Sequence, residues 1–435
     1  MLSRSASNNN ENPCGIAVIG GGRWARTVAG VLGTLAAPDT PLYFCSPSYP
    51  AGWDMWLESH PEIGQERCRI TSDLDALLGN PSVGVVMVVR EARRNASTAM
   101  AALKARKVVF VEKPFAVNLE EAHALIAASQ GRFCVTGLVL LFASNLHRFV
   151  EALPAIGEIR GVQIIWSDAL GEVRHHETKT YDVSLNVAQD VFSHVWSLLR
   201  LIDPDAPLVC DSARAVEGGR GVELKLRLGS AHAVVEVERD AESRRRMLTV
   251  CGKAGQASID FAQEPGLALL NGEPFDVETG YSGPLGRELE YVIGGSSEHP
   301  YSRLSKIEHA VESIALAEGF MPLIREDQYR QVERGLRDEA NAPDRKAADF
   351  ALREIAADRL CSQGTERGGM SSLRASRSSE LWTAIHCWLR GKDDGVGLPA
   401  GIRDDANFLA LKKRLQRPDG LQSARYTCRG RIAKE

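Results

Sequence analysis

Short apolar runs alternate with longer amphipathic stretches in the first part of the chain. Between Gly15 and Gly137 the apolar runs read GIAVIG, LYFC, VGVVMVV, KVVFVE and FCVTG. Runs of this length with amphipathic segments between them predict parallel strands connected by helices. Their continuous apolar character suits strands that helices cover on both faces. We therefore expect residues 13–137 to form an α/β domain of the doubly wound Rossmann type.

The pattern changes beyond Gly137. One strongly apolar helix is predicted near residues 187–202, and the strand-like runs GVELKLRLG, AHAVVEVER, RRMLTVCG and QASIDF follow it closely. Short turns at Gly229-Ser230 and Gly252-Lys253 favour antiparallel neighbours in a meandering sheet. We expect residues 138–320 to form an α+β second domain with a largely antiparallel open sheet.

The two ends of the chain have a different texture. Residues 1–12 are polar and are expected to form a disordered lead. Residues 321–435 alternate charged helical sequence with the Gly/Ser-rich stretch SQGTERGGMSSLRASRSSE, and the last part is basic. We expect a helical, partly flexible extension there, with a solvated tail.

Composition and charge narrow the function classes. The chain has 435 residues, a formal net charge of -4 and 25% charged residues, as an ordinary soluble globular protein has, so nucleic acid is not expected as a partner. The nine cysteines show no CxxC pair and no metal-like spacing, which favours a reducing cytoplasm and no metal site. The apolar runs have the length of strands, so no membrane span is expected.

The first apolar strand runs directly into Gly20-x-Gly22-x-x-Ala25, and the helical sequence TVAGVLGTL follows. This strand, turn and helix order is what the dinucleotide fingerprint requires, because glycines let the backbone approach a pyrophosphate at a helix N-terminus. We expect Gly20, Gly22, Arg23, Trp24 and Ala25 to bind the cofactor. The alternative is a glycine-rich turn that binds nothing.

The second strand lacks the acidic residue that usually binds the adenosine ribose. LYFC is followed by Ser46-Pro47-Ser48 instead. A serine can bind a 2′-phosphate that a carboxylate would repel, and Arg23 or Arg26 would add positive charge, so NADP is favoured over NAD. The alternative is that Ser46 only caps a turn.

Glu112-Lys113-Pro114 follows a buried strand, at the sheet edge where ligands bind in open α/β folds. With this motif the chain resembles the Gfo/Idh/MocA family, named for glucose-fructose oxidoreductase, inositol dehydrogenase and rhizopine catabolism. IGEIRGVQIIWSD and MLTVCGKAGQASID extend the resemblance over about residues 14–319. It implies that Lys113 contacts cofactor and substrate, that Glu112 belongs to the cofactor site, and that Pro114 follows a cis peptide bond. We expect burial and the nicotinamide to lower the pKa of Lys113.

Asp190 and His194 lie four residues apart and so on one side of the predicted apolar helix. They match the family's D-x-x-x-H element, which implies that His194 exchanges a proton with the substrate hydroxyl and that Asp190 assists it. The alternative is a structural histidine paired with a nearby carboxylate. Lys179 and Tyr181 precede the helix and are candidate substrate contacts, or else solvated loop residues.

The sequence departs from the family at several points. The histidine commonly found after the fourth strand is missing from Arg90 to Asn95, and Ser197 replaces an aspartate that often follows the histidine. These changes put the sugar specificity in doubt more than the reaction type. The adjacent His175 and His176 diverge in direction, so a metal site is not expected there.

The function that follows is hydride transfer between NAD(P) and a carbon that bears a hydroxyl or carbonyl group. The resemblance implies a sugar, a sugar derivative or a cyclitol as the small-molecule substrate, and a possible homo-oligomer formed through the second-domain sheet. Two alternatives stay open: an imine reductase of the same fold, and a noncatalytic dinucleotide-binding regulator.

Overall fold

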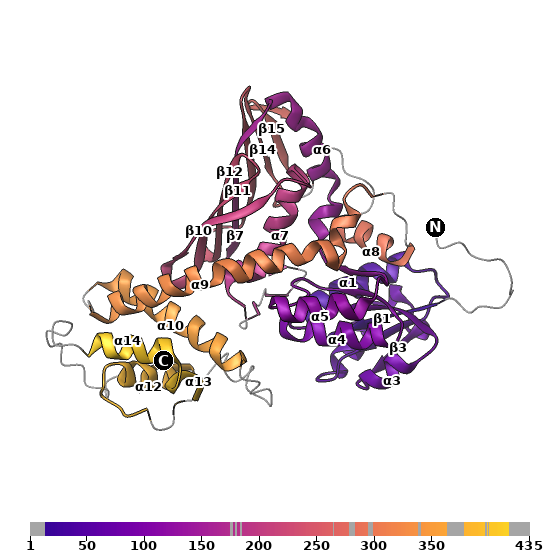
Figure 1. Cartoon of the computed structure of the whole chain (residues 1–435). Coiled ribbons are helices and arrows are strands. Elements are labelled where there is room, and N and C mark those ends of the chain that lie inside the picture. Colours follow the sequence, from indigo (N-terminus) through magenta and orange to yellow (C-terminus); the bar gives the residue numbers. More distant parts are fainter. Residues whose placement is uncertain are drawn as a thin grey trace. The chain divides into compact units, whose positions relative to one another are not determined.

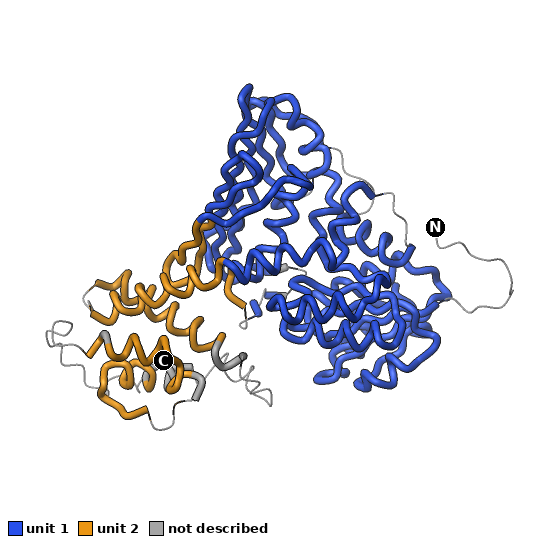
Figure 2. The backbone as a smooth tube through the Cα atoms, in the orientation of Figure 1, with its two compact units in different colours: residues 1–182, 188–211, 225–319 blue, residues 183–187, 212–224, 320–435 orange. Residues whose placement is uncertain are grey.

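The chain is described here from a computed structural model that forms two compact units (Figure 2). The described residues are 14–174, 177–178, 181–182, 185–263, 265–277, 283–294, 299–337, 341–362, 378–395, 398 and 400–416. Unit 1 comprises Met1–Asp182, Ala188–Asp211 and Lys225–Gly319, and unit 2 comprises Val183–Val187, Ser212–Leu224 and Phe320–Glu435. Each unit is described below by itself.

The first sheet of unit 1 is parallel and has six strands in the order β3-β2-β1-β4-β5-β6 (Figure 1). The strands are β1 (Gly15–Ile19), β2 (Leu42–Cys45), β3 (Cys68–Thr71), β4 (Val83–Val88), β5 (Val108–Val111) and β6 (Cys134–Thr136). This order is the doubly wound Rossmann arrangement, and it confirms the predicted fold of the first domain. The order reverses between β1 and β4, which is where such sheets bind ligands.

Helices connect these strands, and side-chain caps begin two of them. The helices are α1 (Arg23–Leu35), α2 (Ala51–Glu58), α3 (Leu74–Gly79), α4 (Ala92–Lys104) and α5 (Leu119–Ser129), with 3-10 turns η1 (Pro61–Ile63) and η2 (Gln65–Arg67). Asp73 accepts the Ala76 N–H at 2.9 Å, and Asn118 accepts the Glu121 N–H at 2.8 Å. These bonds satisfy N–H groups that a helix start leaves without an internal partner.

The second sheet has eight strands in the order β10-β11-β12-β7-β13-β14-β15-β16. The strands are β7 (Ile159–Ala169), β10 (Leu208–Val216), β11 (Gly221–Leu228), β12 (Ala231–Ala241), β13 (Arg245–Gly252), β14 (Gln256–Asp260), β15 (Leu267–Leu270) and β16 (Glu273–Phe275). The short strands β8 (Val173–Arg174) and β9 (Glu177–Thr178) pair separately. The mixed α/β class with a mostly antiparallel second sheet is confirmed.

The sheet is not the simple meander that the short turns predicted. Strand β7 lies between β12 and β13, parallel to β12 and antiparallel to β13. Since Ala241 pairs with Ala169 and Arg245 pairs with Ser167, the chain from β12 to β13 passes the end of β7. The apolar positions of β7 therefore contribute to the middle of the sheet, although this strand comes first in sequence.

Contacts with α9 (Ile307–Arg337) hold α7 (Val187–Ile202) in place. The other helices of this part of the chain are α6 (Ser144–Ala152) and α8 (Pro284–Gly294), with 3-10 turns η3 (Val139–Phe142), η4 (Leu153–Ile156), η5 (Glu217–Gly219) and η6 (Ser302–Ser305). The Trp196 indole and the Arg200 Nε of α7 both donate to Glu312 Oε2 of α9, at 2.7 and 2.9 Å. These bonds, together with an apolar face, set the position of α7.

Unit 2 has an apolar core of its own. It contains α10 (Ala342–Ser362), α12 (Ser378–Leu389), α13 (Ala400–Arg403), α14 (Ala406–Leu415) and the end of α9. Trp388, Phe408 and Leu411 are among its buried residues. Trp382 is outside the residues whose side chains are described, and the basic tail beyond residue 416 is outside the described residues altogether. No helix in the described part of the chain combines the length and the apolar character that a membrane crossing needs.

Candidate functional site

The glycine turn joins β1 to α1 as the sequence predicts. Gly20 has a φ of +147°, and a Cβ on it would lie 1.9 Å from the backbone oxygen of Val89, so only glycine fits. A Cβ on Gly22 would meet no atom of the described residues within 4 Å. The first turn of α1, which contains Arg23 and Trp24, has no acidic residue and no side-chain cap. The helix therefore presents N–H groups to open space, as an anionic ligand requires.

Neighbouring side chains hold this turn. Trp53 of α2 is buried and donates its indole N–H to Gly20 O at 2.9 Å, and Arg26 Nη1 donates to Gly21 O at 3.0 Å. Ala25 is buried 3.2 Å from the position of a Cβ on Gly20. Trp53 was not predicted from the sequence. The one available signal was that an aromatic residue lies in the helix after the second strand.

Ser46 directly follows β2 and is 3% exposed. Its Oγ accepts the N–H of Tyr49 at 3.2 Å, and it lies 2.6 Å from the position of a Cβ on Gly21. This is the turn-capping geometry that the sequence left open beside phosphate binding. Ser46 also limits residue 21 to glycine, so it helps to shape the turn.

The Glu112-Lys113-Pro114 turn follows β5 at the same edge of the sheet. The Glu112 N–H donates to Val88 O at the end of β4, at 2.8 Å. The peptide bond between Lys113 and Pro114 is cis, as the family resemblance implied. Both candidate motifs of the first domain thus lie at the carboxyl ends of central strands, where the strand order reverses.

Asn95 of α4 is fully buried and binds the backbone of this turn. Its Nδ2 donates to Glu112 O at 3.0 Å and to Pro114 O at 3.1 Å, while its Oδ1 accepts the Arg90 N–H at 3.3 Å. From the sequence, the segment from Arg90 to Asn95 was distinguished only by a missing histidine. Nothing in the local sequence indicates that Asn95 fixes a turn 17 residues away.

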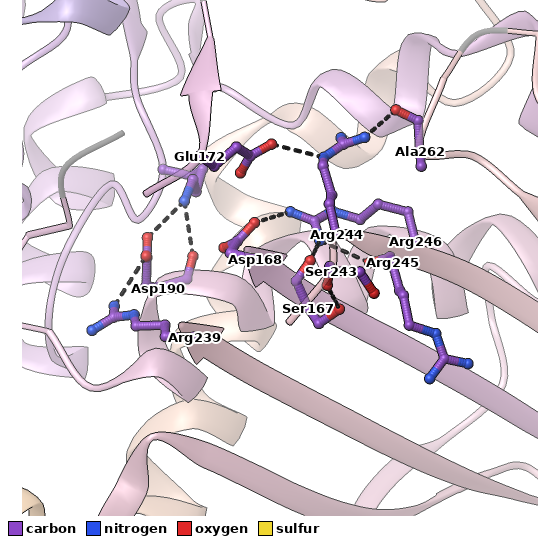
Figure 3. A network of polar contacts seen from close by, with 11 residues as sticks. Ser167, Asp168, Glu172, Asp190, Arg239, Ser243, Arg244, Arg245, Arg246 and Ala262 are labelled. Carbon is purple, nitrogen blue, oxygen red and sulfur yellow. Dashed lines mark hydrogen bonds and ion pairs between the residues drawn. The ribbon is translucent and has the colours of Figure 1, made fainter. Parts of the chain in front are cut away.

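Lys113 and Asp190 meet although 77 residues separate them. Lys113 Nζ donates to Asp190 Oδ1 at 2.9 Å and to its backbone oxygen at 2.8 Å. Arg239 of β12 donates to the other carboxylate oxygen, Oδ2, at 3.1 Å (Figure 3). The side chains of Lys113, Asp190 and Arg239 are 16%, 22% and 7% exposed. One carboxylate thus binds two cations in a largely desolvated place.

These charges change the proton affinities of the turn. Burial lowers the pKa of Lys113, but the carboxylates of Asp190 and Glu112 outweigh burial, so its pKa lies above the ordinary value. The lowering that we expected from burial is therefore wrong in this structure, and Lys113 keeps its proton. Protein atoms surround the carboxyl group of Glu112 although some of its surface is exposed, and this burial raises its pKa to about 7.

A second carboxyl group, that of Glu288, contacts the chain just after β6, where the Glu112 carboxyl group also lies. Glu288 of α8 accepts the N–H of Leu138 at 2.7 Å, and Glu112 Oε2 lies 2.6 Å from the position of a Cβ on Gly137. Burial, aided by the charge of Glu112, raises the pKa of Glu288 well above its ordinary value. Two carboxyl groups with raised pKa values therefore flank the end of β6.

His194 lies one helical turn after Asp190 and stacks on Trp166 of β7. The ring centroids are 5.1 Å apart and the planes differ by 12°. The guanidinium of Arg246 lies 3.8 Å from the same indole and forms a buried ion pair with Asp168 (Figure 3). Trp166 thus contacts both His194 and the buried Arg246–Asp168 ion pair of the sheet.

Trp166, Arg239 and Arg246 were not predicted, because the β7 segment was interpreted only through the family resemblance, and β12 and β13 only as closely spaced strands. Charged residues at buried strand positions were the available signal, since a charge is seldom buried unless it is paired. A sequence does not tell which of these charges meet. Here β12 and β13 bring the two arginines to either side of β7.

Tyr181 also approaches this group. The guanidinium of Arg239 lies 4.8 Å from the centre of its ring, and burial raises the pKa of Tyr181 to about 12. Lys179, His175 and His176 lie outside the described residues. Within the described ranges, no group of three or more His, Cys, Asp or Glu side chains could hold a metal ion.

The arrangement offers a defined set of chemical groups. Lys113 is a charged hydrogen-bond donor, and Asp190 fixes it from α7. His194 brings an imidazole, which exchanges a proton near neutral pH. With an uncapped, acid-free helix start at the same sheet edge, these groups suit a reaction that moves a proton beside a phosphorylated cofactor.

Comparison with known proteins agrees with this geometry. Residues 14–138 match the oxidoreductase family described as GFO_IDH_MocA, with an NAD-binding Rossmann fold. A 1-carboxy-3-chloro-3,4-dihydroxycyclohexa-1,5-diene dehydrogenase of Comamonas testosteroni is 29% identical over 37% of this chain and 44% of its own length. The levoglucosan dehydrogenase of Pseudarthrobacter phenanthrenivorans is 26% identical over 57% of this chain and 73% of its own length. The chain thus spans less than half of the first relative.

A solved structure shows the same fold at lower identity. The aldose-aldose oxidoreductase of Caulobacter crescentus has a TM-score of 0.60 and 18% identity. The superposition covers 72% of this chain and 98% of that one. More than a quarter of the present chain therefore has no counterpart in that structure.

Proposed function

We propose that this chain, whose residues 14–138 match the Gfo/Idh/MocA oxidoreductase family, is an NAD(P)-dependent dehydrogenase or reductase. It transfers hydride to or from a carbon that bears a hydroxyl or carbonyl group in a sugar, sugar derivative or cyclitol. The observation that carries this proposal is the 2.9 Å contact of Lys113 with Asp190, one helical turn from His194. The named dehydrogenases among the relatives support the reaction class.

The dinucleotide binds to the glycine turn in this proposal. The open space at Gly22 and the uncapped, acid-free start of α1 fit a pyrophosphate. No carboxylate follows β2, and Arg23 and Arg26 lie on the first turns of α1, which favours the extra phosphate of NADP over NAD. The bound nicotinamide supplies or accepts the hydride.

Three residues divide the remaining chemistry. Lys113 donates a hydrogen bond to the reacting oxygen and stabilises negative charge on it, since its raised pKa keeps it protonated. His194 takes the hydroxyl proton during oxidation and returns it during reduction. Asp190 neutralises and orients Lys113, and Arg239 orients Asp190. Glu112, Pro114 and Asn95 hold the turn that carries the lysine.

The remaining assignments complete the proposal. Residues 13–137 bind the cofactor. Residues 138–320 supply the substrate pocket and the sheet through which a homo-oligomer forms. Tyr181 contributes to the contact with the substrate. A cytoplasmic location is part of the proposal and rests on the spacing of the cysteines along the chain.

Cofactor titration followed by turnover tests the proposal. NADPH and NADH fluorescence is titrated with the full chain, and a panel of sugars and cyclitols is then assayed for reduction of NADP and NAD. We expect binding of NADPH, and a loss of kcat of about 100-fold or more in Lys113→Ala and His194→Ala.

Two matched variants serve as controls. Lys253→Ala removes a lysine whose side chain is 49% exposed, and His123→Ala removes an exposed histidine of α5. Both should leave turnover at the level of the unaltered chain. Failure of both cofactors to bind contradicts the proposal, and binding with unchanged turnover in Lys113→Ala and His194→Ala contradicts the residue roles.

A further inference from the structure

Unit 2 contains the extension that follows residue 320. Its helices share a core in which Ile355, Ile385, Trp388 and Phe408 are at most 2% exposed. Lys412 lies 4.5 Å from the ring centre of Trp388, so the start of the basic C-terminal region takes part in this packing. The region is a folded unit, and its contacts with the rest of unit 2 indicate what it does.

A buried polar cluster lies where α9 and α10 meet the turn between β10 and β11. Gln328 is 0% exposed, and its Nε2 donates to Glu354 Oε2 at 2.8 Å and to Gly218 O at 2.9 Å. Gln331 accepts the Gly218 N–H at 2.7 Å and donates to Ala215 O at 2.8 Å. Buried polar groups that are all bonded specify one arrangement, because each alternative leaves some of them unsatisfied.

Two glycines allow this close approach. A Cβ on Gly218 would lie 2.1 Å from the backbone oxygen of Ala347, and a Cβ on Gly219 would lie 2.5 Å from Glu354 Oε2. Both glycines have positive φ angles, +78° and +108°. Helix α10 therefore packs directly on the backbone of the turn, and Glu354 has little room to move.

Glu354 also binds the residue that precedes α7. Asn186 is 6% exposed, and its Nδ2 donates to Glu354 Oε2 at 2.7 Å, so this single oxygen accepts from both Asn186 and Gln328. Helix α7 begins at the next residue, Val187, and Asp190 lies in its first turn. A carboxylate held at a helix N-terminus also interacts favourably with the helix dipole.

We propose that Glu354 is a positioning residue: it fixes Asn186, and through it the first turn of α7 that carries Asp190. The inference rests on the proposed function, because it assigns to the extension a task in that reaction. Helix α7 is anchored at its other end by Glu312, and Glu354 adds a restraint at its start beside the bonds that Lys113 and Arg239 make to Asp190. The extension thereby becomes part of the enzyme's catalytic framework.

Reversal of the hydrogen bond tests the proposal in the full chain. Glu354→Ala removes the acceptor, and Asn186→Asp places two carboxylates together, so each single change removes the bond. We expect kcat to fall about tenfold or more in each, with an unchanged KM for NADPH, since neither change touches the glycine turn. The double variant Asn186→Asp with Glu354→Gln pairs a carboxylate at 186 with an amide at 354 that donates to it, and it should recover most of the kcat lost in Asn186→Asp.

Hydrogen–deuterium exchange supplies a readout that needs no substrate. Amides of the first turn of α7 should exchange faster in both single variants and return toward the original rate in the double variant. Gln331→Ala is the matched control: it removes part-buried hydrogen bonds between the extension and the β10–β11 turn but none to Asn186. It should leave the kcat and the exchange of α7 unchanged.

The outcomes separate this inference from the proposed function. Unchanged exchange in α7, a double variant no better than the singles, or an equal effect of Gln331→Ala would overturn the role of Glu354. If the unaltered chain turns over no substrate, the proposed function fails, and the exchange measurements still decide whether Glu354 restrains α7.

Discussion

Glu112 carries its carboxyl group among protein atoms beside Lys113, and burial raises the pKa of that carboxyl from 4.5 to about 7. Between these two values the folded protein holds a proton that the unfolded chain has released. The folded state then binds more protons, so the free energy of unfolding falls as the pH rises through this window. The ionised Glu112 carboxyl group therefore lowers the free energy of unfolding at neutral pH.

The variant Glu112→Gln should weaken this pH dependence. An amide of the same shape does not titrate, so the loss of stability between pH 5 and 7.5 should shrink by on the order of 2 kcal/mol. Urea denaturation of both proteins at the two pH values measures the change. Glu288→Gln should flatten the slope in the same direction, because burial raises the pKa of Glu288 as well. Parallel slopes in the original chain and Glu112→Gln would show that Glu112 ionises normally.

Single residues differ in how far the sequence reveals them. Gly20 and Lys113 stand in motifs whose spacing along the chain reflects local geometry, and the structure brings Lys113 and Asp190 into contact. Asn95, Trp166 and Arg239 belong to no local pattern. Each becomes important through a partner that the fold supplies from a distant segment, and one sequence carries no record of that pairing.

The turn between β10 and β11 shows how one element accommodates another. Gly218→Ala combines a positive φ with a Cβ that would lie 2.1 Å from Ala347 O and 2.8 Å from Ala351 N. Because both are backbone atoms of α10, the helix itself must shift. We expect the free energy of unfolding of unit 2 to fall by on the order of 3 kcal/mol. Denaturation followed by the emission of Trp388 measures this change.

Gly272→Ala separates strain from crowding. Gly272 has a similar φ of +86°, but a Cβ there would meet no described atom within 4 Å. Gly272→Ala should lower the free energy of unfolding by about 1 kcal/mol, because only the backbone conformation disfavours alanine there. Equal losses in the two variants would argue against the close contact of α10 with the turn.

Helices and strands with a long, regular pattern of apolar residues were the most predictable. The runs that became β1, β4, β5 and α7 are long, apolar and bounded by turns, and their predicted limits agree with the structure. The strands β3, β10, β15 and β16 were missed because they are short or polar on one side. The place of β7 between β12 and β13 depends on long-range pairing, which turn lengths do not report.

At the scale of the whole molecule, the units do not follow the order of the sequence. Unit 2 assembles Val183–Val187 and Ser212–Leu224 with everything after Phe320. A division into consecutive segments does not show that two short pieces of the middle of the chain pack with its end. The function of the extension was therefore out of reach of the sequence, although its helices were expected.

The stack of His194 on Trp166 gives the protein a spectroscopic signal of its own. A protonated imidazole quenches the emission of an indole against which it packs more strongly than a neutral one does, so the light from Trp166 should report the charge of His194. The chain has seven tryptophans, and subtracting the emission of Trp166→Phe isolates this one. A titration of that difference between pH 5 and 8 follows the proton on His194 before any substrate is known. A flat difference would mean that no change of charge on His194 reaches Trp166 in this pH range.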